Sequence, residues 1–339
     1  MIKKFIQMIG VSMFIVVSTP ALSDTIETVK SRGILNCGVN TGLPGFSGID
    51  SNGIWQGLDV DFCRSVAAAV LGDSAKVRFV PLNVTQRFVA LQSGEIDVLS
   101  RNTTWTLTRD TQLGLSATTI NFHDGVGFMV RSKEKNLSIK DLNQSTICML
   151  SGISSAQNVN DLFKSKNLKY TVIFFEDLKT AVSAYDSGRC NVYSNDKSQL
   201  ASIRATMLKN SEDHSILNDI VVKSPLGPMV RQGDEKWQKL ITWIHFAMLT
   251  AEELGVNSKN VDSTEKKSPE IDRLLGRNNQ NFGKAFDLDS QWAYRVIKQV
   301  GNYEEVYERN VGKNSPLKME RGQNALWSKG GLQFAPAVQ

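Results

Sequence analysis

Hydroxyl and amide side chains crowd into residues 100–110, SRNTTWTLTRD, and Arg109 stands near the end of this polar run. An apolar run, residues 96–99, comes just before it and predicts a short buried strand. Loops that follow strands are where α/β proteins usually present their ligand groups. Small donors beside a permanently charged guanidinium suit the binding of a carboxylate. The alternative is a helix cap at Thr106 or Thr108 with Arg109 on the surface, and this run alone does not decide between the two.

Two polar positions in the second half of the chain complement this loop. Residues 151–155, SGISS, follow a predicted strand, and the N–H groups and serine hydroxyls at a helix start form an anion site. Asp196 follows another predicted strand and suits an ammonium group. Helix capping is the alternative for both, since a helix is predicted to begin at Lys197. Arg109 and Asp196 together would bind a zwitterion, because burying either ligand charge unpaired costs several kcal/mol.

The sequence offers little for catalysis, metal binding or phosphate binding. Its three histidines, His123, His214 and His245, lie far apart and favour structural roles. Neither a G-x-S-x-G elbow nor an H-E-x-x-H motif occurs. The glycine-rich residues 42–48, GLPGFSG, lack the lysine and the spacing of a P-loop and predict turns. We therefore expect a protein that is not an enzyme and that uses no cofactor and no metal.

The polar segments need a scaffold, and the hydrophobic pattern predicts one that is built twice. In the first half, strands at residues 34–39, 77–80 and 96–99 alternate with helices at 60–71 and 85–92. In the second half, strands are predicted at 126–130, 145–150, 170–175 and 190–194, with a helix at 178–186. Such alternation is typical of parallel sheets flanked by helices. We predict an α/β protein of two lobes, each with a polar loop after its last strand.

Two extended segments, residues 121–125 and 223–228, are predicted to connect the lobes. The second contains two prolines, which exclude a helix and stiffen the path. An amphipathic helix at residues 237–253 then packs back on the first lobe. The expected division is a first lobe at 24–122, a second lobe at 123–224, and a return segment with a C-terminal extension at 225–339. The extension has no role that the sequence reveals.

Residues 1–23 have the pattern of an export signal. Lys3 and Lys4 precede an apolar core at residues 5–17, and ALS at residues 21–23 forms a small-residue cleavage site. The apolar core is shorter than the ~20 residues that a membrane span needs. We therefore expect a soluble periplasmic protein. The formal net charge of +5 is scattered without a basic stripe, so we expect no nucleic-acid binding.

Four cysteines, Cys37, Cys63, Cys148 and Cys190, would enter an oxidising compartment, where three pairings are possible. The first two fall in the first predicted lobe and the other two in the second. We therefore predict the disulfides Cys37–Cys63 and Cys148–Cys190, and buried free thiols are the alternative. Zinc binding is not expected, because no C-x-x-C spacing and no nearby histidine pair occur.

Several motifs give the chain a resemblance to a known family. They are GLPGF at 42–46, GLDVDFC at 57–63, ALQSGEIDVLSRNTTWTLTR at 90–109, GRC at 188–190, PLGP at 225–228 and ALW at 325–327. Through them the chain resembles family 3 periplasmic solute-binding proteins of ABC transporters, and within that family the general L-amino acid-binding subfamily. The similarity covers essentially the whole mature chain. It implies a two-lobed type II periplasmic-binding-protein fold, with two mixed or parallel sheets flanked by helices and a two-segment hinge.

The same resemblance implies roles for the polar loops. Arg109 would bind the α-carboxylate of the ligand, and Thr104 and the backbone near Asn102 would contact it from the same loop. Asp196 would hold the α-ammonium group. The helix-start donors would be Ser154 and Ser155.

The positions Asn40, Leu43 and Val84 match those that line the side-chain pocket in the family. Val84 stands where some relatives place an aromatic residue, and this difference favours a roomy pocket. Asn191 stands where aspartate is common, and SGISS at 151–155 departs from the more usual S/T-G-T pattern. Either departure could shift ligand preference without abolishing binding.

We therefore expect an exported monomer that closes on one L-amino acid and delivers it to the membrane permease subunits of an ABC transporter. Ligand contacts on both lobes would favour the closed state over the open one. Two other classes stay open at this stage. One is an enzyme of the cyclic amino-acid dehydratase type, which needs a general acid in the cleft. The other is a ligand-sensing module, which usually continues into a membrane anchor or a kinase.

Overall fold

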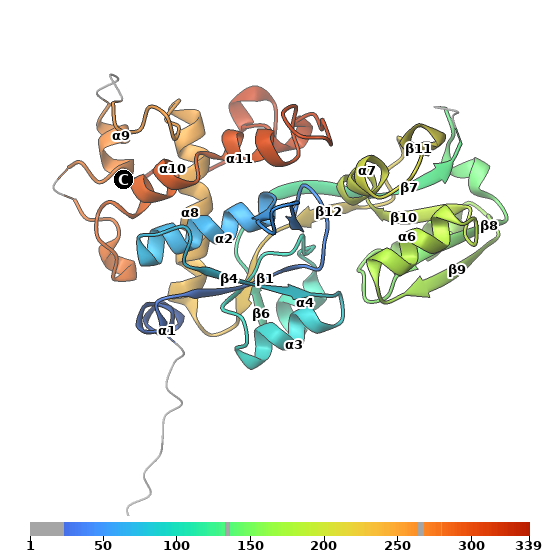
Figure 1. Ribbon diagram of the computed structural model, residues 1–339, viewed down its shortest axis with the longest axis horizontal. Coiled ribbons are helices and arrows are strands. Elements are labelled where there is room, and N and C mark those ends of the chain that lie inside the picture. The colour runs from blue at the N-terminus through green and yellow to red at the C-terminus, as the bar shows by residue number, and fades with distance from the viewer. Residues whose placement is uncertain (1–23, 133–135, 264–267, 279) are drawn as a thin grey trace, which may run out of the picture.

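The computed structural model describes residues 24–132, 136–263, 268–278 and 280–339, so the predicted signal peptide at residues 1–23 lies outside the described residues. Two separate sheets with flanking helices form two lobes, with the first lobe at the left and centre of Figure 1 and the second at the right. Across the described ranges, no helix is long and apolar enough to span a membrane. The same ranges contain no group of three or more His, Cys, Asp or Glu side chains that could hold a metal ion.

The first lobe is built on a sheet of five strands, which are β1 (Leu35–Asn40), β4 (Val77–Leu82), β5 (Val98–Leu99), β6 (Leu115–Ala117) and β13 (Met229–Arg231). Their order is β4-β1-β5-β13-β6. β1 runs parallel to both β4 and β5, as the alternation of strands and helices predicts. β13 runs antiparallel between β5 and β6, so the chain joins this sheet again after it has built the second lobe.

Four helices belong to this part of the chain, namely α1 (Thr25–Arg32), α2 (Leu58–Leu71), α3 (Gln86–Ser93) and α4 (Leu107–Gln112). A small hairpin, β2 (Gly48–Ile49) and β3 (Trp55–Gln56), precedes α2. Gly57 begins α2 with a φ of 132°, and a Cβ there would lie 2.1 Å from the Phe46 carbonyl oxygen, so only glycine fits. Cys37 on β1 and Cys63 on α2 form the predicted disulfide, which ties the sheet to its covering helix.

The second lobe has the strands β7 (Phe122–Arg131), β8 (Ser145–Leu150), β9 (Tyr170–Phe175), β10 (Val192–Asp196), β11 (His214–Ile216) and β12 (Lys223–Leu226). The sheet order is β11-β7-β10-β8-β9, with β12 paired to β7. β10, β8 and β9 run parallel, and β7 is antiparallel to β10. The helices of this lobe are α5 (Ala156–Ser165), α6 (Leu178–Asp186) and α7 (Lys197–Thr206). Cys148 on β8 and Cys190 just before β10 form the second predicted disulfide.

Two paired strands connect the lobes. β7 and β12 run antiparallel, with Phe122 opposite Leu226 and Gly125 opposite Lys223. They overlap residues 121–125 and 223–228, for which the sequence predicts connections between the lobes. Because both passages lie side by side in one ribbon, the lobes are joined along a single line (Figure 1).

The return of the chain adds the helices α8 (Glu235–Glu253), α9 (Pro269–Leu274), α10 (Trp292–Gln299) and α11 (Tyr303–Asn310). Short 3₁₀ turns occur at Ile139–Leu142, Ser211–Asp213, Lys284–Phe286, Gly322–Asn324 and Trp327–Lys329. α8 packs back on the first lobe, where the buried Trp237 indole donates to the Asp97 carbonyl at 3.0 Å. α10 packs against both α2 and α8, so the C-terminal extension covers the first lobe (Figure 1).

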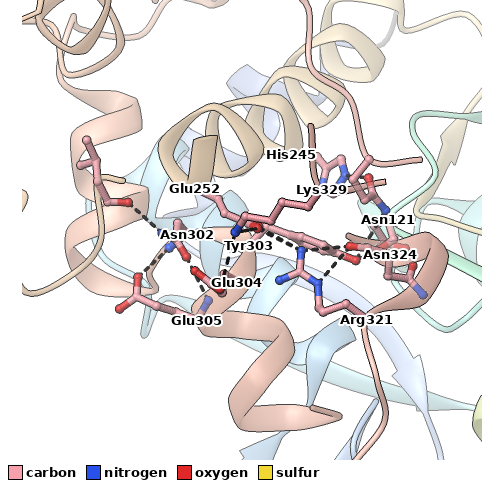
Figure 2. A network of polar contacts seen from close by, with 12 residues as sticks. Asn121, His245, Glu252, Asn302, Tyr303, Glu304, Glu305, Arg321, Asn324 and Lys329 are labelled. Atoms are coloured by element: carbon pink, nitrogen blue, oxygen red, sulfur yellow. Dashed lines mark hydrogen bonds and ion pairs between the residues drawn. The ribbon is translucent and has the colours of Figure 1, made fainter. Parts of the chain in front are cut away.

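The end of the extension reaches the strand that leaves the first lobe (Figure 2). The Asn324 side chain accepts from the His123 backbone N–H at 2.6 Å and donates to its carbonyl at 3.0 Å. The buried Tyr303 hydroxyl donates to the Asn121 carbonyl at 2.8 Å. His245 shares a 3.2 Å hydrogen bond with Gln333, and burial lowers the pKa of this histidine to about 4. The extension therefore holds the start of β7 through hydrogen bonds to the β7 backbone. No pattern in the sequence of the extension predicts these bonds.

Candidate ligand-binding site

A pocket lies where the carboxyl ends of parallel strands from both sheets face one another. Asn40 ends β1, Asn102 and Thr104 follow β5, and Leu150 and Asp196 end β8 and β10. Ligands of α/β proteins usually bind at this end of the strands. The lining residues are Asn40, Thr41, Asn83, Val84, Arg87, Arg101, Asn102, Thr104, Arg109, Leu150, Ile153, Ser154, Ser155, Glu176, Leu178, Asn195, Asp196 and Gln199. Eight of the nine residues predicted for the site are among them.

Arg109 is buried at the cleft, with 6% of its surface exposed. Thr106 does cap α4, since its side chain accepts from the Arg109 N–H at 3.3 Å, yet the arginine side chain does not point to the surface. Its Nη1 donates to the Thr104 carbonyl at 2.9 Å, and its Nη2 donates to the Gly152 carbonyl of the other lobe at 3.4 Å. Burial lowers the pKa of Arg109 to about 10, so the group stays cationic at neutral pH.

The loop that carries Arg109 is held rigidly by its surroundings. Asn102 has a φ of 37°, and its side-chain oxygen accepts from the Asn40 amide at 3.3 Å. The Thr104 hydroxyl lies 3.0 Å from the Ser224 hydroxyl on β12. Arg101 donates through Nε to the Leu82 carbonyl at 2.7 Å. Fixed side chains of this kind reduce the ordering cost of binding a ligand.

Asp196 faces this loop from the second lobe. It occupies the N-cap position of α7, but its side chain makes no capping hydrogen bond and accepts instead from the Gln199 amide at 3.2 Å. Asp124 on β7 caps α7 instead, because its two carboxylate oxygens lie 3.3 Å and 3.4 Å from the Ser198 backbone nitrogen. Asp196 is therefore available to the pocket.

The carboxyl groups of Asp196 and Asp124 both have raised pKa values. Burial raises the pKa of Asp196 to about 6, and hydrogen bonds from Ser224 and Gln199 and the charge of Arg109 oppose the shift. Burial and the neighbouring charge of Asp196 raise the pKa of Asp124 to about 7. The pair accordingly holds less than its full negative charge just below neutral pH.

Ser154 and Ser155 line the pocket at the start of α5. Ser155 is the N-cap residue and is buried, yet its side chain makes no capping hydrogen bond. The hydroxyl is therefore not engaged by its own helix. Gly152, with a φ of 73°, makes the turn that brings both serines into the wall.

Leu43 departs from the expectation that it lines the pocket. It is fully buried in the hydrophobic core, and its backbone pairs with Ser47 across a tight turn, with N···O distances of 2.6 Å and 2.8 Å. The turn directs this apolar side chain into the core. This arrangement is favourable because it removes the apolar surface of Leu43 from water. Thr41 lies in the pocket wall instead, and Val84, Leu150, Ile153 and Leu178 supply apolar surface.

Sequence reasoning missed the second and third arginines of the pocket. Arg101 stands in the polar run itself, next to Asn102, so its neighbourhood was a signal. Arg87 lies on α3 and is 3% exposed, although a helix arginine ordinarily lies in solvent. Gln199, one turn into α7, was missed because its only signal is its spacing of three residues from Asp196.

The two walls of the pocket lie close together. Besides the contact of Arg109 with Gly152, the Ser202 hydroxyl donates to the Pro44 carbonyl at 2.6 Å across the lobes. The free volume between the walls is about 30 Å³. The lobes therefore lie close together around a small, polar space.

Comparisons with known proteins agree with this geometry. The model of the bacterial extracellular solute-binding proteins, family 3, matches residues 35–312. The general L-amino acid-binding periplasmic protein of Rhizobium johnstonii is 49% identical, over 98% of this chain and 97% of its own. The glutamate/glutamine/aspartate/asparagine-binding protein of Rhodobacter capsulatus is 44% identical, over 96% and 97%. A periplasmic binding protein of an ABC transporter from Brucella ovis, solved with glutathione bound, has a TM-score of 0.91 and 47% identity, with 94% of this chain and 100% of that chain covered.

Proposed function

The chain belongs to the bacterial extracellular solute-binding proteins of family 3, and we propose that it binds L-amino acids between its lobes for delivery to an ABC permease. Its α/β architecture is the expected type II periplasmic-binding-protein fold. It is a solute-binding component of transport rather than an enzyme, as are its close relatives. The cleft-enzyme alternative therefore falls away.

One observation carries the choice of ligand. A buried guanidinium from one lobe, Arg109, and a buried carboxylate from the other, Asp196, line the same pocket. An L-amino acid presents the two opposite charges that such a pair requires, and each ligand charge that enters unpaired would cost several kcal/mol. Thr104, Ser154 and Ser155 line the same pocket, and on this proposal they donate to the ligand carboxylate.

The proposed mechanism is hinge closure about the ribbon of β7 and β12. On this proposal residues 24–122 and 225–339 form one lobe and residues 123–224 the other. A ligand that contacts both walls binds the closed state more tightly than the open one. This difference in binding free energy sets how far the ligand shifts the equilibrium toward closure. Closure also removes water, which strengthens the ion pairs with Arg109 and Asp196.

Export, location and assembly complete the proposal. The relative from Rhizobium johnstonii is a periplasmic protein, and residues 1–23 have the pattern of a signal peptide that would direct this chain to the same compartment. Two disulfides fit an oxidising compartment. We assign the protein as a monomer that presents its closed form to the permease subunits.

The relatives suggest a panel of ligands for the first test. The ligands of these relatives are L-amino acids in general, the acidic amino acids and their amides, and glutathione. Thermal unfolding of the purified mature protein should therefore be followed with each L-amino acid, selected D-forms, glutathione and sugars. A ligand at 100 times its Kd adds ~2.7 kcal/mol, which shifts Tm by a few degrees. Shifts with L-forms and none with D-forms are expected, whereas no shift with any amino acid, for protein free of carried-over ligand, contradicts the proposal.

A further inference from the structure

Arg87 is a buried cation in the pocket wall whose hydrogen-bonding capacity is largely unused. Its exposed fraction is 3%. Within the described part of the chain its Nε has no hydrogen-bond partner, and its Nη1 makes one long contact of 3.4 Å to the Thr103 hydroxyl. Buried arginines are ordinarily paired with an acceptor, because an unpaired buried charge is costly. This arginine therefore lacks the partner that its burial calls for.

Arg87 and Arg109 lie against the same aromatic ring. The guanidinium carbon of Arg87 is 4.6 Å from the centroid of Phe88, and that of Arg109 is 5.2 Å from it. Both arginines line the pocket. Stacking on one ring fixes the two cations at neighbouring places on one wall, so an anion held by Arg109 has a second cation within reach of the same molecule.

When a simple zwitterion is bound in the pocket, Arg87 is a cation without an opposite charge to pair with. Arg101 has the buried Asp59 as the carboxyl group whose charge favours its ionised form. Arg109 and Asp196 are taken up by the ligand α-carboxylate and α-ammonium in the proposed function. Burial and the charges of Arg101 and Arg109 lower the pKa of Arg87, and the charge of Asp196 opposes this shift. In the proposed function Asp196 pairs with the ligand ammonium, so Arg87 has no carboxylate of its own.

We infer that Arg87 forms a second anion subsite, which receives the side-chain carboxylate of an acidic L-amino acid. The inference rests on the proposed function, because it needs Arg109 and Asp196 to hold the main-chain groups. A carboxylate is the complementary partner, since the guanidinium offers two parallel donors to it. Basic side chains are excluded from this position by like-charge repulsion. The subsite therefore makes the protein favour acidic ligands over aliphatic ones of similar size.

Calorimetric titration of the purified mature protein with L-glutamate, L-leucine and L-lysine tests the subsite. Arg87→Met removes the charge and keeps a long side chain, and Arg87→Lys keeps the charge without the paired donors. Arg64→Met is the matched control, because Arg64 also lies over a ring, Phe79 at 5.7 Å, but pairs with Asp61 away from the pocket. We expect L-glutamate to bind wild type at least about tenfold more tightly than L-leucine, and L-lysine more weakly than either.

In Arg87→Met the affinity for L-glutamate should fall by about tenfold or more while that for L-leucine stays within about threefold. Arg87→Lys should recover part of the loss, and Arg64→Met should match wild type. Equal losses for L-glutamate and L-leucine would assign Arg87 a purely structural role and overturn the inference. So would a wild-type protein that binds L-leucine as tightly as L-glutamate. Failure of wild type to bind any amino acid would instead overturn the proposed function itself.

Glutathione carries the same charged groups as L-glutamate, namely one ammonium and two carboxylates. The narrow space between the walls favours the compact amino acid. Glutathione should therefore bind more weakly than L-glutamate. Tighter binding of glutathione, with a larger loss in Arg87→Met, would assign the subsite to a peptide carboxylate and overturn the amino-acid assignment.

Discussion

Two polar clusters in this protein, one around Arg321 and one around Arg87, are built in opposite ways. Arg321 in the C-terminal extension pairs with the buried Glu252 at 3.0 Å and donates to the Asn324 carbonyl at 2.9 Å (Figure 2). Its guanidinium also lies 5.0 Å and 4.9 Å from the rings of Tyr303 and Tyr307. Arg87 in the cleft has one ring and one hydrogen bond of 3.4 Å. The first cation is satisfied by the fold and the second is not.

This difference separates polar groups that hold the structure from those that await a ligand. Buried polar groups are normally paired, and a fully paired network rigidifies the chain around it. An incompletely paired cluster costs stability, and it persists where a bound molecule supplies the missing partners. The cleft, with Arg87, Arg109 and Asp196, is of the second kind.

The largest effect on binding is expected at Arg109. Arg109→Met should weaken the binding of L-glutamate by about 100- to 1,000-fold, because the α-carboxylate would be buried without its partner. Calorimetric titration measures the loss. A loss of only a few-fold, in a variant that unfolds at the wild-type temperature, would remove Arg109 from the site.

A smaller but pH-dependent effect is expected at Asp196. Burial raises its pKa to about 6, so the carboxylate is protonated as the pH falls through this value, whereas the ligand ammonium binds the ionised form. The affinity of wild type for L-glutamate should therefore be flat above pH 7 and fall below pH 6. Asp196→Asn should lower the affinity by about 10- to 100-fold at pH 7.5.

The pH profile provides the control for this assignment. Asp196→Asn should lose most of the dependence between pH 5 and 7 that wild type shows, with the residual slope coming from the ligand itself and from Asp124. The same slope in the variant and in wild type would contradict the pairing of Asp196 with the ammonium group.

The smallest effect on binding is expected at Arg321, together with a large effect on stability. Arg321→Met leaves Glu252, whose side chain is 1% exposed, with only the more distant Lys329 at 3.7 Å. The free energy of unfolding should fall by roughly 2–4 kcal/mol, as expected when a buried ion pair loses one partner. Chemical denaturation measures this change, and L-glutamate affinity should stay within about threefold of wild type. A loss of affinity as large as that of Arg109→Met would erase the distinction between the two clusters.

Local sequence patterns predicted the scaffold closely. The strands β8 and β9 and the helix α6 have the predicted bounds, because alternation of apolar runs and turn residues is a local signal. Both disulfides have the predicted partners, since each pair falls within one sheet and its flanking elements. The polar ends of the strands and the resemblance together named eight of the eighteen residues that line the pocket.

The remaining features depend on contacts between distant segments. Leu43 left the pocket because a turn directs it into the core, which no local pattern reveals. Arg87 has the sequence context of a solvent-exposed helix residue, and its burial in the pocket wall follows from the packing of the folded chain. Asp124 caps α7 from a strand 74 residues away, and this is why Asp196 faces the pocket rather than its own helix.

Hydrogen exchange with and without L-glutamate tests the contrast between the two clusters most directly. Exchange reports local opening of the backbone, so groups that gain partners become protected. Saturating L-glutamate should slow exchange in peptides that cover residues 100–109 of one lobe and residues 152–158 and 196–200 of the other. Peptides that cover residues 302–307 and 321–333 should exchange at the same rate in both states. Protection of one wall alone, or protection concentrated in the C-terminal extension, would contradict a ligand held between the lobes by the incompletely paired groups of the cleft.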